Sequence, residues 1–189
     1  MNITEKILAR ASGKSSLSPD DVVFAKVDKV MVHDVSGPGV LKVFDKLQKQ
    51  GIDTSKLHDS TKVWIAEDHF VPSAEKISAE NIVKLSNFSK QYDIKKHFKY
   101  GMGQYGICHT LSHEEALVNP GEVYVGGDSH TNTTGGLGAF ACGLGHTDIA
   151  YVLLNGKIWF KIPETLYFKL NGKLPEHVMA KDLILKIIG

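Results

Sequence analysis

The sequence predicts an α/β domain in three layers (α/β/α), with helices on both faces of a largely parallel sheet. Short runs rich in Val and Ile, typical of buried strands, alternate with longer segments of helical periodicity. Several of the strand runs also end in polar residues that include His and Asp. In a parallel sheet these ends meet at one edge, which is where ligands bind.

The first half of the chain supplies three helices and three strands. Helices are predicted where apolar residues recur at helical spacing, at 4–11, 40–50 and 73–92. Thr4 and Ser73 are the predicted N-caps, and Ile77, Ile82 and Leu85 are predicted to face inward. Strands are predicted at three segments rich in β-branched and aromatic residues, namely 22–32, 62–68 and 97–100.

The second half begins with a glycine-rich segment, 101–116, which we interpret as a loop, and continues with a fourth strand at 122–127. Small residues at helical spacing predict one long helix over 138–155. Residues 157–174 predict two strands around a proline turn, and residues 180–189 predict a last helix.

Composition excludes several classes of partner. The 189 residues carry 22 basic and 21 acidic side chains, a net charge of +1, which gives no electrostatic reason to expect a nucleic-acid or membrane partner. No apolar run approaches the ~20 residues of a membrane-spanning helix. With two cysteines, no CxxC motif and no signal-peptide pattern, a reduced cytoplasmic protein is expected.

Four polar clusters follow predicted strands or lie in adjoining loops: His33-Asp34, Asp68-His69, Cys108-His109 and Asp128-Ser129-His130. An imidazole beside a carboxylate has a fixed tautomer and a raised basicity, as proton transfer requires. Asp68 with His69, and His109 with Asp128, are therefore two candidate acid–base pairs. Neighbouring residues of a strand point to opposite faces, so pairing across strands is an equally open alternative.

Each cluster also has an ordinary structural interpretation. Asp128 and Ser129 can simply cap a following helix, because their oxygens accept bonds from free N–H groups. Cys142 is expected to be a small core residue, whereas Cys108 beside His109 is a possible thiol nucleophile. The remaining histidines in polar surroundings are expected at the surface, namely His58, His97, His113 and His177.

Several motifs occur in an order that resembles one family. They are VDKVMVHDVSGP (27–38), EDHFVPS (67–73), GICH (106–109), GGDSHT (126–131) and GAFACGLGHTD (138–148). Together they resemble the aconitase superfamily, in particular the N-terminal part of the large subunits of 3-isopropylmalate dehydratase and homoaconitase. Gly39 departs from the pattern, since many relatives have a longer polar residue there, so no substrate contact is carried over to it.

The resemblance implies that residues 1–189 form an aconitase-like N-terminal α/β domain, a fragment of a longer large subunit. It implies a [4Fe-4S] cluster whose open iron acts as a Lewis acid on the substrate. By position, the implied catalytic residues are Asp68, His69, His109, Asp128 and His130, and the implied substrate-binding residues are Ser129 and Ser36. None of these is an implied metal ligand, because the cluster cysteines of the family lie in a following domain.

The expected function is the large-subunit part of a hydro-lyase that interconverts hydroxy acids such as 2- and 3-isopropylmalate through an unsaturated intermediate, as in leucine biosynthesis. The expected partners are the other large-subunit domains and a small subunit. Three alternatives stay open. They are a homoaconitase or aconitase-type hydratase, a catalytically silent binding or assembly module, and a divalent-metal hydrolase using the His/Asp cluster, although no HExxH or HxH spacing supports the last.

Overall fold

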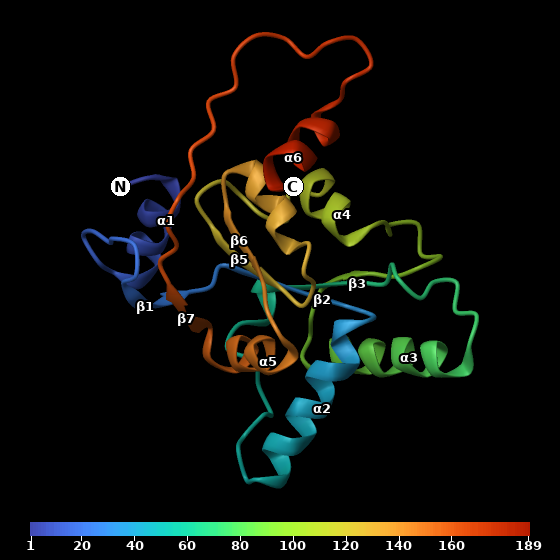
Figure 1. Cartoon of the computed structure of the whole chain (residues 1–189). Helices are drawn as coiled ribbons and strands as arrows, with labels where there is room; N and C mark the ends of the chain where they lie inside the picture. The colour runs from blue at the N-terminus through green and yellow to red at the C-terminus, as the bar shows by residue number, and fades with distance from the viewer.

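The computed structural model describes residues 1–189 and is centred on a five-stranded sheet in the order β4-β3-β2-β5-β6 (Figure 1). All four strand pairs are parallel. The strands are β2 (Lys29–His33), β3 (Val63–Ala66), β4 (Lys96–Phe98), β5 (Val123–Gly126) and β6 (Phe140–Gly143). Because β2 is the central strand, its last residue, His33, lies in the middle of the edge where the strands end.

Helices cover both faces of this sheet, which confirms the predicted three-layer α/β/α fold. Figure 1 shows α2 (Ser36–Lys49), α3 (Lys76–Gln91) and α5 (His146–Asn155) on one side, and α4 (Cys108–Glu114) on the other. The remaining helices are α1 (Ile3–Ser12) and α6 (Ala180–Ile188), with two short 3-10 helices, η1 (Ser60–Lys62) and η2 (Thr131–Leu137). None of these helices combines the length and the apolar character that a membrane span requires.

Alternate residues of the strands feed two separate cores. In β2, Val30 and Val32 enter a cluster of 27 buried residues on the face covered by α2, α3 and α5, whereas Met31 enters a cluster of 10 on the opposite face. This alternation follows from the pleat, which points successive side chains to opposite faces. Both faces of the strands are buried, which is typical of a parallel sheet.

The predicted strand 22–32 is in fact two strands in two sheets. β1 (Val22–Lys26) pairs antiparallel with β7 (Lys157–Lys161), while β2 begins at Lys29. The break lies at Asp28, whose carboxylate accepts the Val123 N–H (2.9 Å) instead of continuing the strand. No hydropathy pattern reveals a carboxylate that is committed to a distant backbone N–H.

The predicted helix 138–155 is also wrong in its first half. Residues 140–143 form β6, and α5 begins only at His146. At Gly143, any Cβ would lie 2.4 Å from the carbonyl oxygen of Asp128, so only glycine lets β6 run this close to the end of β5. The small residues therefore serve close strand packing, not a helix.

Smaller differences concern caps and short elements. The N-caps are Asn2 and Glu75, not Thr4 and Ser73. Ile77, predicted inward, is 63% exposed, whereas Leu85 is buried as predicted. The segment 101–116, interpreted as a loop, contains α4, and the segment 157–174 contains β7 but not the predicted second strand.

The last part of the chain contributes nothing to either core. From 163 to 189 no residue is buried, although the segment includes Leu166, Tyr167, Phe168 and the amphipathic helix α6. Figure 1 shows this segment as an extended arm that leaves β7 and ends in α6. The folded body therefore ends near Ile162, which is 1% exposed.

Candidate functional site

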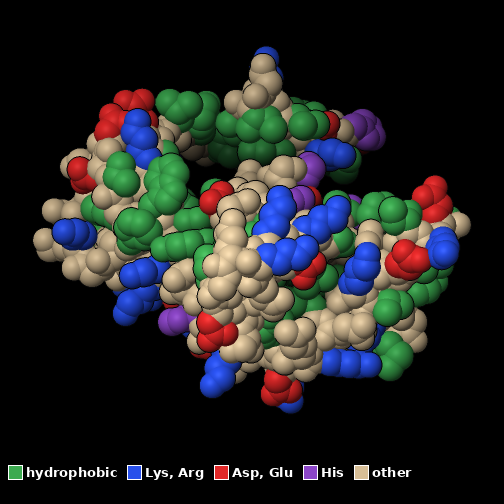
Figure 2. Space-filling view, turned by 90° about the horizontal axis from the view of Figure 1, so that it is seen from below, with side chains coloured by type: hydrophobic (Ala, Val, Ile, Leu, Met, Phe, Trp, Pro, Cys, Tyr) green, Lys and Arg blue, Asp and Glu red, His purple; other side chains and the backbone are tan.

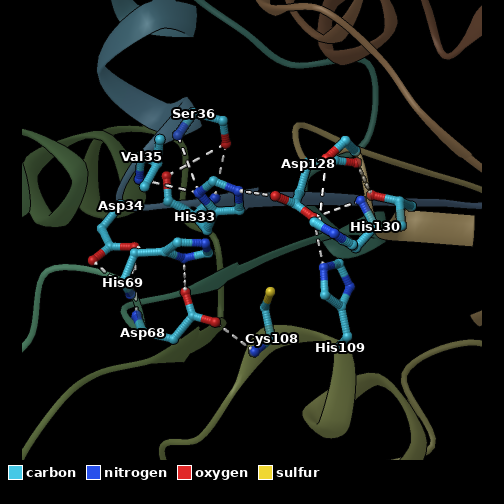
Figure 3. A network of polar contacts seen from close by, with 12 residues as sticks. His33, Asp34, Val35, Ser36, Asp68, His69, Cys108, His109, Asp128 and His130 are labelled. Carbon is cyan, nitrogen blue, oxygen red and sulfur yellow. Dashed lines mark hydrogen bonds and ion pairs between the residues drawn. The ribbon is translucent and has the colours of Figure 1, made fainter. Parts of the chain in front are cut away.

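The predicted site residues converge at the carboxyl ends of the central strands. Figure 3 shows side chains from the ends of β2, β3 and β5 and from the start of α4 pointing toward one another. They surround a cavity of about 210 Å³ lined by Asp68, His69, Ile107, Cys108, His109, Asp128 and His130. All five residues that the sequence implied as catalytic are among this lining.

One half of the site is anchored by Asp34, directly after β2. Its fully buried carboxylate accepts the backbone N–H groups of Asp68 (3.4 Å), His69 (3.1 Å) and Phe70 (2.6 Å). A buried carboxylate is stable only when its oxygens are hydrogen-bonded, and here three donors converge on it. Asp34 therefore fixes the turn that carries the first acid–base pair.

Within that turn, Asp68 and His69 face each other. The Asp68 carboxylate lies 2.7 Å from His69 Nδ1, and its other oxygen accepts the Cys108 N–H at 2.7 Å. Burial alone would raise the pKa of Asp68, but these contacts outweigh it and lower the pKa below its usual value. Both residues lie beyond the last residue of β3, Ala66, so strand alternation does not separate them.

The second pair is assembled from two segments. His109 Nε2, from α4, lies 2.7 Å from the carboxylate of Asp128, which follows β5. The same carboxylate oxygen accepts the backbone N–H of His130 at 2.8 Å, so the local turn and the imidazole share Asp128. Burial alone would raise the pKa of Asp128, but the hydrogen bonds from His130 and His109 have the larger combined effect and lower it to about 2.

His33, which the family resemblance does not mark as a site residue, lies between the two pairs. Its ring is 1% exposed and stacks on His69 at a centroid distance of 4.6 Å. Its Nε2 faces Asp128 Oδ2 at 3.6 Å. The signal was present in the sequence, because His33-Asp34 follows a strand as the other clusters do.

The other predicted residues lie further from the cavity. Ser129 is exposed, with its hydroxyl 3.3 Å from His130 Nδ1, and the His130 ring is itself exposed. Ser36 is fully buried, and its hydroxyl accepts the His33 N–H at 3.1 Å. The backbone just after β5 approaches Ser36 so closely that a Cβ on Gly127 would lie 2.5 Å from the Ser36 hydroxyl. The substrate-binding roles of Ser129 and Ser36 stay predictions.

The cysteines do not provide a nucleophile or a cluster site. Cys108 is fully buried, and burial together with the nearby Asp68 carboxylate raises the pKa of its thiol far above the ordinary value, which disfavours the reactive thiolate. Cys142 is half-buried against the larger core, where burial again raises the thiol pKa. An iron–sulfur cluster needs three or four thiolates, so these residues alone do not fit one.

His97 corrects one expectation about the surface histidines. Its side chain is buried, not exposed, and its Nε2 lies 3.0 Å from the buried carboxylate of Glu67, which also accepts the Tyr100 N–H at 3.2 Å. Glu67 and Asp68 thus hold the two ends of the glycine-rich loop before α4. The other predicted surface histidines are exposed, namely His58, His113 and His177.

Two other features concern ligands. The side chains of His33, Asp34 and His69, and those of His109, Asp128 and His130, each offer atoms within 4.8 Å of one another, a spacing compatible with a metal ion. In the first group neither ring nitrogen of His33 is available to an ion, because Nδ1 accepts two backbone N–H groups and Nε2 is buried. At Gly39, the ring of His146 occupies the space that a Cβ would need, at 2.3 Å. A side chain at position 39 would therefore displace the exposed His146 ring from its present position.

The chain is similar to known proteins over its whole length. A profile of the aconitase family (aconitate hydratase) matches residues 5–189. The whole chain is 45% identical to the 3-isopropylmalate dehydratase large subunit of Heliobacterium modesticaldum and 44% identical to that of Aquifex aeolicus. It is 43% identical to the probable 3-isopropylmalate dehydratase large subunit of Methanothermobacter thermautotrophicus.

The chain spans less than half the length of these curated relatives. The matches cover 100% of this chain but 43%, 42% and 43% of the three relatives, respectively. The family match extends over nearly all of the folded body and the arm, and it includes every residue of the site described above. The chain belongs to the aconitase family.

Proposed function

We propose that residues 1–189 are the acid–base part of a hydro-lyase that moves a hydroxyl group between adjacent carbons of a hydroxy acid, as in the isomerisation of 2- and 3-isopropylmalate. One observation carries the proposal: the Asp68–His69 and His109–Asp128 pairs line a single cavity, in a chain 45% identical to a 3-isopropylmalate dehydratase large subunit. Reversible dehydration needs a group that protonates the leaving hydroxyl, and the cavity offers two acid–base pairs.

The two pairs support different roles. His69 binds Asp68 through Nδ1 and is 40% exposed, so its Nε2 is free to give a proton to the leaving hydroxyl. His109 binds Asp128 through Nε2, and its own Nδ1 is buried, so its role is to orient the carboxylate, not to transfer the proton itself. Asp128 then accepts a hydrogen bond from the hydroxyl or the water that replaces it.

The cluster and the remaining contacts come from sequence outside these residues. A [4Fe-4S] cluster with one open iron supplies Lewis-acid activation of the hydroxyl when it is bound. In this proposal, the cysteines that bind the cluster belong to the part of the relatives that this chain does not span. Residues 1–189, that part and a small subunit together form the proposed cytoplasmic assembly. We therefore propose that residues 1–189 act as one domain of a larger assembly.

The arm supports this division. Its exposed Leu166, Tyr167 and Phe168 and the apolar face of α6 have no core of their own. Single exposed apolar residues are ordinary, but a run of them is typical of an interaction surface. We propose that the arm packs against the following domain of a longer chain.

The 189-residue chain alone is therefore expected to take up no cluster and to show no dehydratase turnover. Anaerobic reconstitution followed by iron and sulfide analysis tests whether the chain binds a cluster. An assay that follows the ultraviolet absorbance of the unsaturated reaction intermediate tests for turnover. Near four irons per chain (the content of a [4Fe-4S] cluster), lost when Cys108 and Cys142 are replaced, would contradict the cluster assignment. Turnover by the pure chain would contradict the proposal that the cluster and the other substrate contacts lie outside residues 1–189.

A chimera tests the function itself. Residues 1–189 replace the matching part of the Heliobacterium modesticaldum large subunit, and the protein is combined with the small subunit of that organism. We expect cluster-dependent turnover of 3-isopropylmalate. A chimera that assembles with its small subunit and holds its cluster but is inactive would favour the silent assembly module, and turnover of homocitrate or citrate alone would favour the hydratase alternatives.

A further inference from the structure

His33 is fixed in one tautomer by its surroundings. Its Nδ1 accepts two backbone N–H groups, from Val35 at 3.0 Å and from Ser36 at 3.1 Å. A nitrogen that accepts hydrogen bonds carries no proton, so in the neutral ring the proton is on Nε2. The stacked His69 ring and the buried position further disfavour a charged imidazolium, and burial, the main cause, lowers the pKa of His33.

The resulting Nε2–H has no hydrogen-bond partner. Nε2 is buried, and its nearest acceptor, Asp128 Oδ2, lies at 3.6 Å, just beyond hydrogen-bond distance. A buried donor without a partner costs folding free energy, and such groups are rare in native proteins. A donor held in this way by two backbone contacts at the opposite side of the ring calls for a functional reason.

The position of the donor indicates what it acts on. Asp128 uses its Oδ1 for His109 Nε2 (2.7 Å) and the His130 N–H (2.8 Å), which leaves Oδ2 facing His33. His33 Nε2 is too deeply buried for a ligand to reach it. One face of the His33 ring stacks on the ring of His69. His33 is thus in contact with one member of each acid–base pair.

We propose that His33 is a positioning residue, a neutral imidazole held as an Nε2–H donor that orients the Asp128 carboxylate for His109 and links the two acid–base pairs. This inference rests on the proposed function only for its effect on turnover. The gap of 3.6 Å closes to a hydrogen bond when Asp128 engages a ligand, because catalytic hydrogen bonds are commonly long in the free protein and tighten in the complex.

Two substitutions separate the two sides of the ring. His33→Asn keeps an acceptor oxygen where Nδ1 lies but removes the donor that faces Asp128. His33→Gln places an amide where Nε2 lies but removes the acceptor for Val35 and Ser36. If His33 only holds the turn after β2, His33→Gln should lower turnover and the protection of the His109 Nε2–H proton, and His33→Asn should change them little. The positioning role predicts the reverse.

The first readout is NMR of the 189-residue chain, which needs no turnover. Long-range ¹H–¹⁵N spectra at neutral pH are expected to show His33 as the Nε2–H tautomer. The His109 Nε2–H proton, protected from exchange by Asp128, is expected to lose protection in His33→Asn and to keep most of it in His33→Gln. An Nδ1–H tautomer, a charged ring, or loss of protection only in His33→Gln would overturn the proposal. If a variant does not fold, the spectrum of the unmodified chain is the test: a neutral Nε2–H ring at His33 supports the proposal, and any other form contradicts it.

The second readout is turnover of the chimera. His33→Asn is expected to lower kcat by about 10–100-fold, less than the loss of a positioned acid or base itself, and His33→Gln by less than His33→Asn. Equal losses in both variants would overturn the positioning role. An inactive chimera whose NMR results hold would instead count against the hydro-lyase function and leave His33 as the residue that orients Asp128.

Discussion

The two acid–base pairs are built in different ways, although they line the same cavity. Asp68 and His69 are neighbours in one turn, which the buried Asp34 holds through three backbone N–H groups. His109 and Asp128 are 19 residues apart, and they meet because α4 packs against η2, the 3-10 helix that follows Asp128. The first pair depends on one buried anchor, whereas the second depends on the packing of the smaller core, with His33 at its side.

This difference suggests that the pairs fail differently when they are altered. Under the proposed function, removing a member of either pair is expected to lower turnover directly. Removing Asp34 releases the first pair by loosening its turn, and leaves the second in place. Protonation of Asp128 in acid removes the charge that holds His109, and so acts first on the second pair.

The largest expected effect is on turnover. In the chimera, His69→Ala and Asp128→Asn are each expected to lower turnover by ~10²–10⁴, because a positioned acid or base contributes about that much. Steady-state kinetics, with cluster content measured for each variant, checks this. His58→Ala is the matched control, since His58 is exposed and outside the cavity, and it is expected to change turnover little. Wild-type turnover in His69→Ala with an intact cluster would show that the Asp68–His69 pair has no part in the reaction.

The next effect is on stability. Asp34→Ala leaves three backbone N–H groups without their acceptor in a buried place, so we expect the free energy of unfolding to fall by about 1–3 kcal/mol or more. Asp34→Asn keeps one acceptor oxygen and is expected to cost less. Urea denaturation of the 189-residue chain measures both. An unchanged midpoint in Asp34→Ala would mean that the turn is held by other contacts.

The smallest effect is the pH dependence contributed by Asp128. Its pKa of about 2 lies below the value of about 4 expected in the unfolded chain, so ionised Asp128 stabilises the fold above about pH 4. As the pH falls from about 4 toward 2, the unfolded state takes up the proton first and this stabilisation is lost. The difference in free energy of unfolding between the unmodified chain and Asp128→Asn is therefore expected to shrink over that range. A difference that stays constant with pH would argue against the lowered pKa.

The sequence predicted the architecture and the lining of the cavity, because both depend on regular features. Buried strands and amphipathic helices have clear periodicities, and the polar residues that follow parallel strands must meet at one edge. The sequence leaves the contact between Asp68 and His69 open, because neighbours inside a strand point to opposite faces and the pattern does not fix where the strand ends. The structure places both beyond β3, where they turn toward each other.

What the sequence did not predict depends on contacts between distant residues. The break at Asp28 depends on the Val123 N–H, and the strand β6 depends on the close approach of Gly143 to Asp128. His97 was predicted at the surface because its neighbours are lysines, but Glu67, thirty residues earlier, gives it a buried partner. His33 carried the same signal as the other clusters, yet only the three-dimensional arrangement shows that it lies between the two pairs.

The central claim is that the two pairs form one functional unit, and a double-mutant cycle in the chimera tests it most directly. Turnover is measured for His69→Ala, for Asp128→Asn and for the two combined, at equal cluster content. Residues that act as a unit have strongly non-additive effects, so we expect the double variant to fall within about tenfold of the slower single variant. Losses that multiply would contradict the claim, and would mean that the pairs act independently.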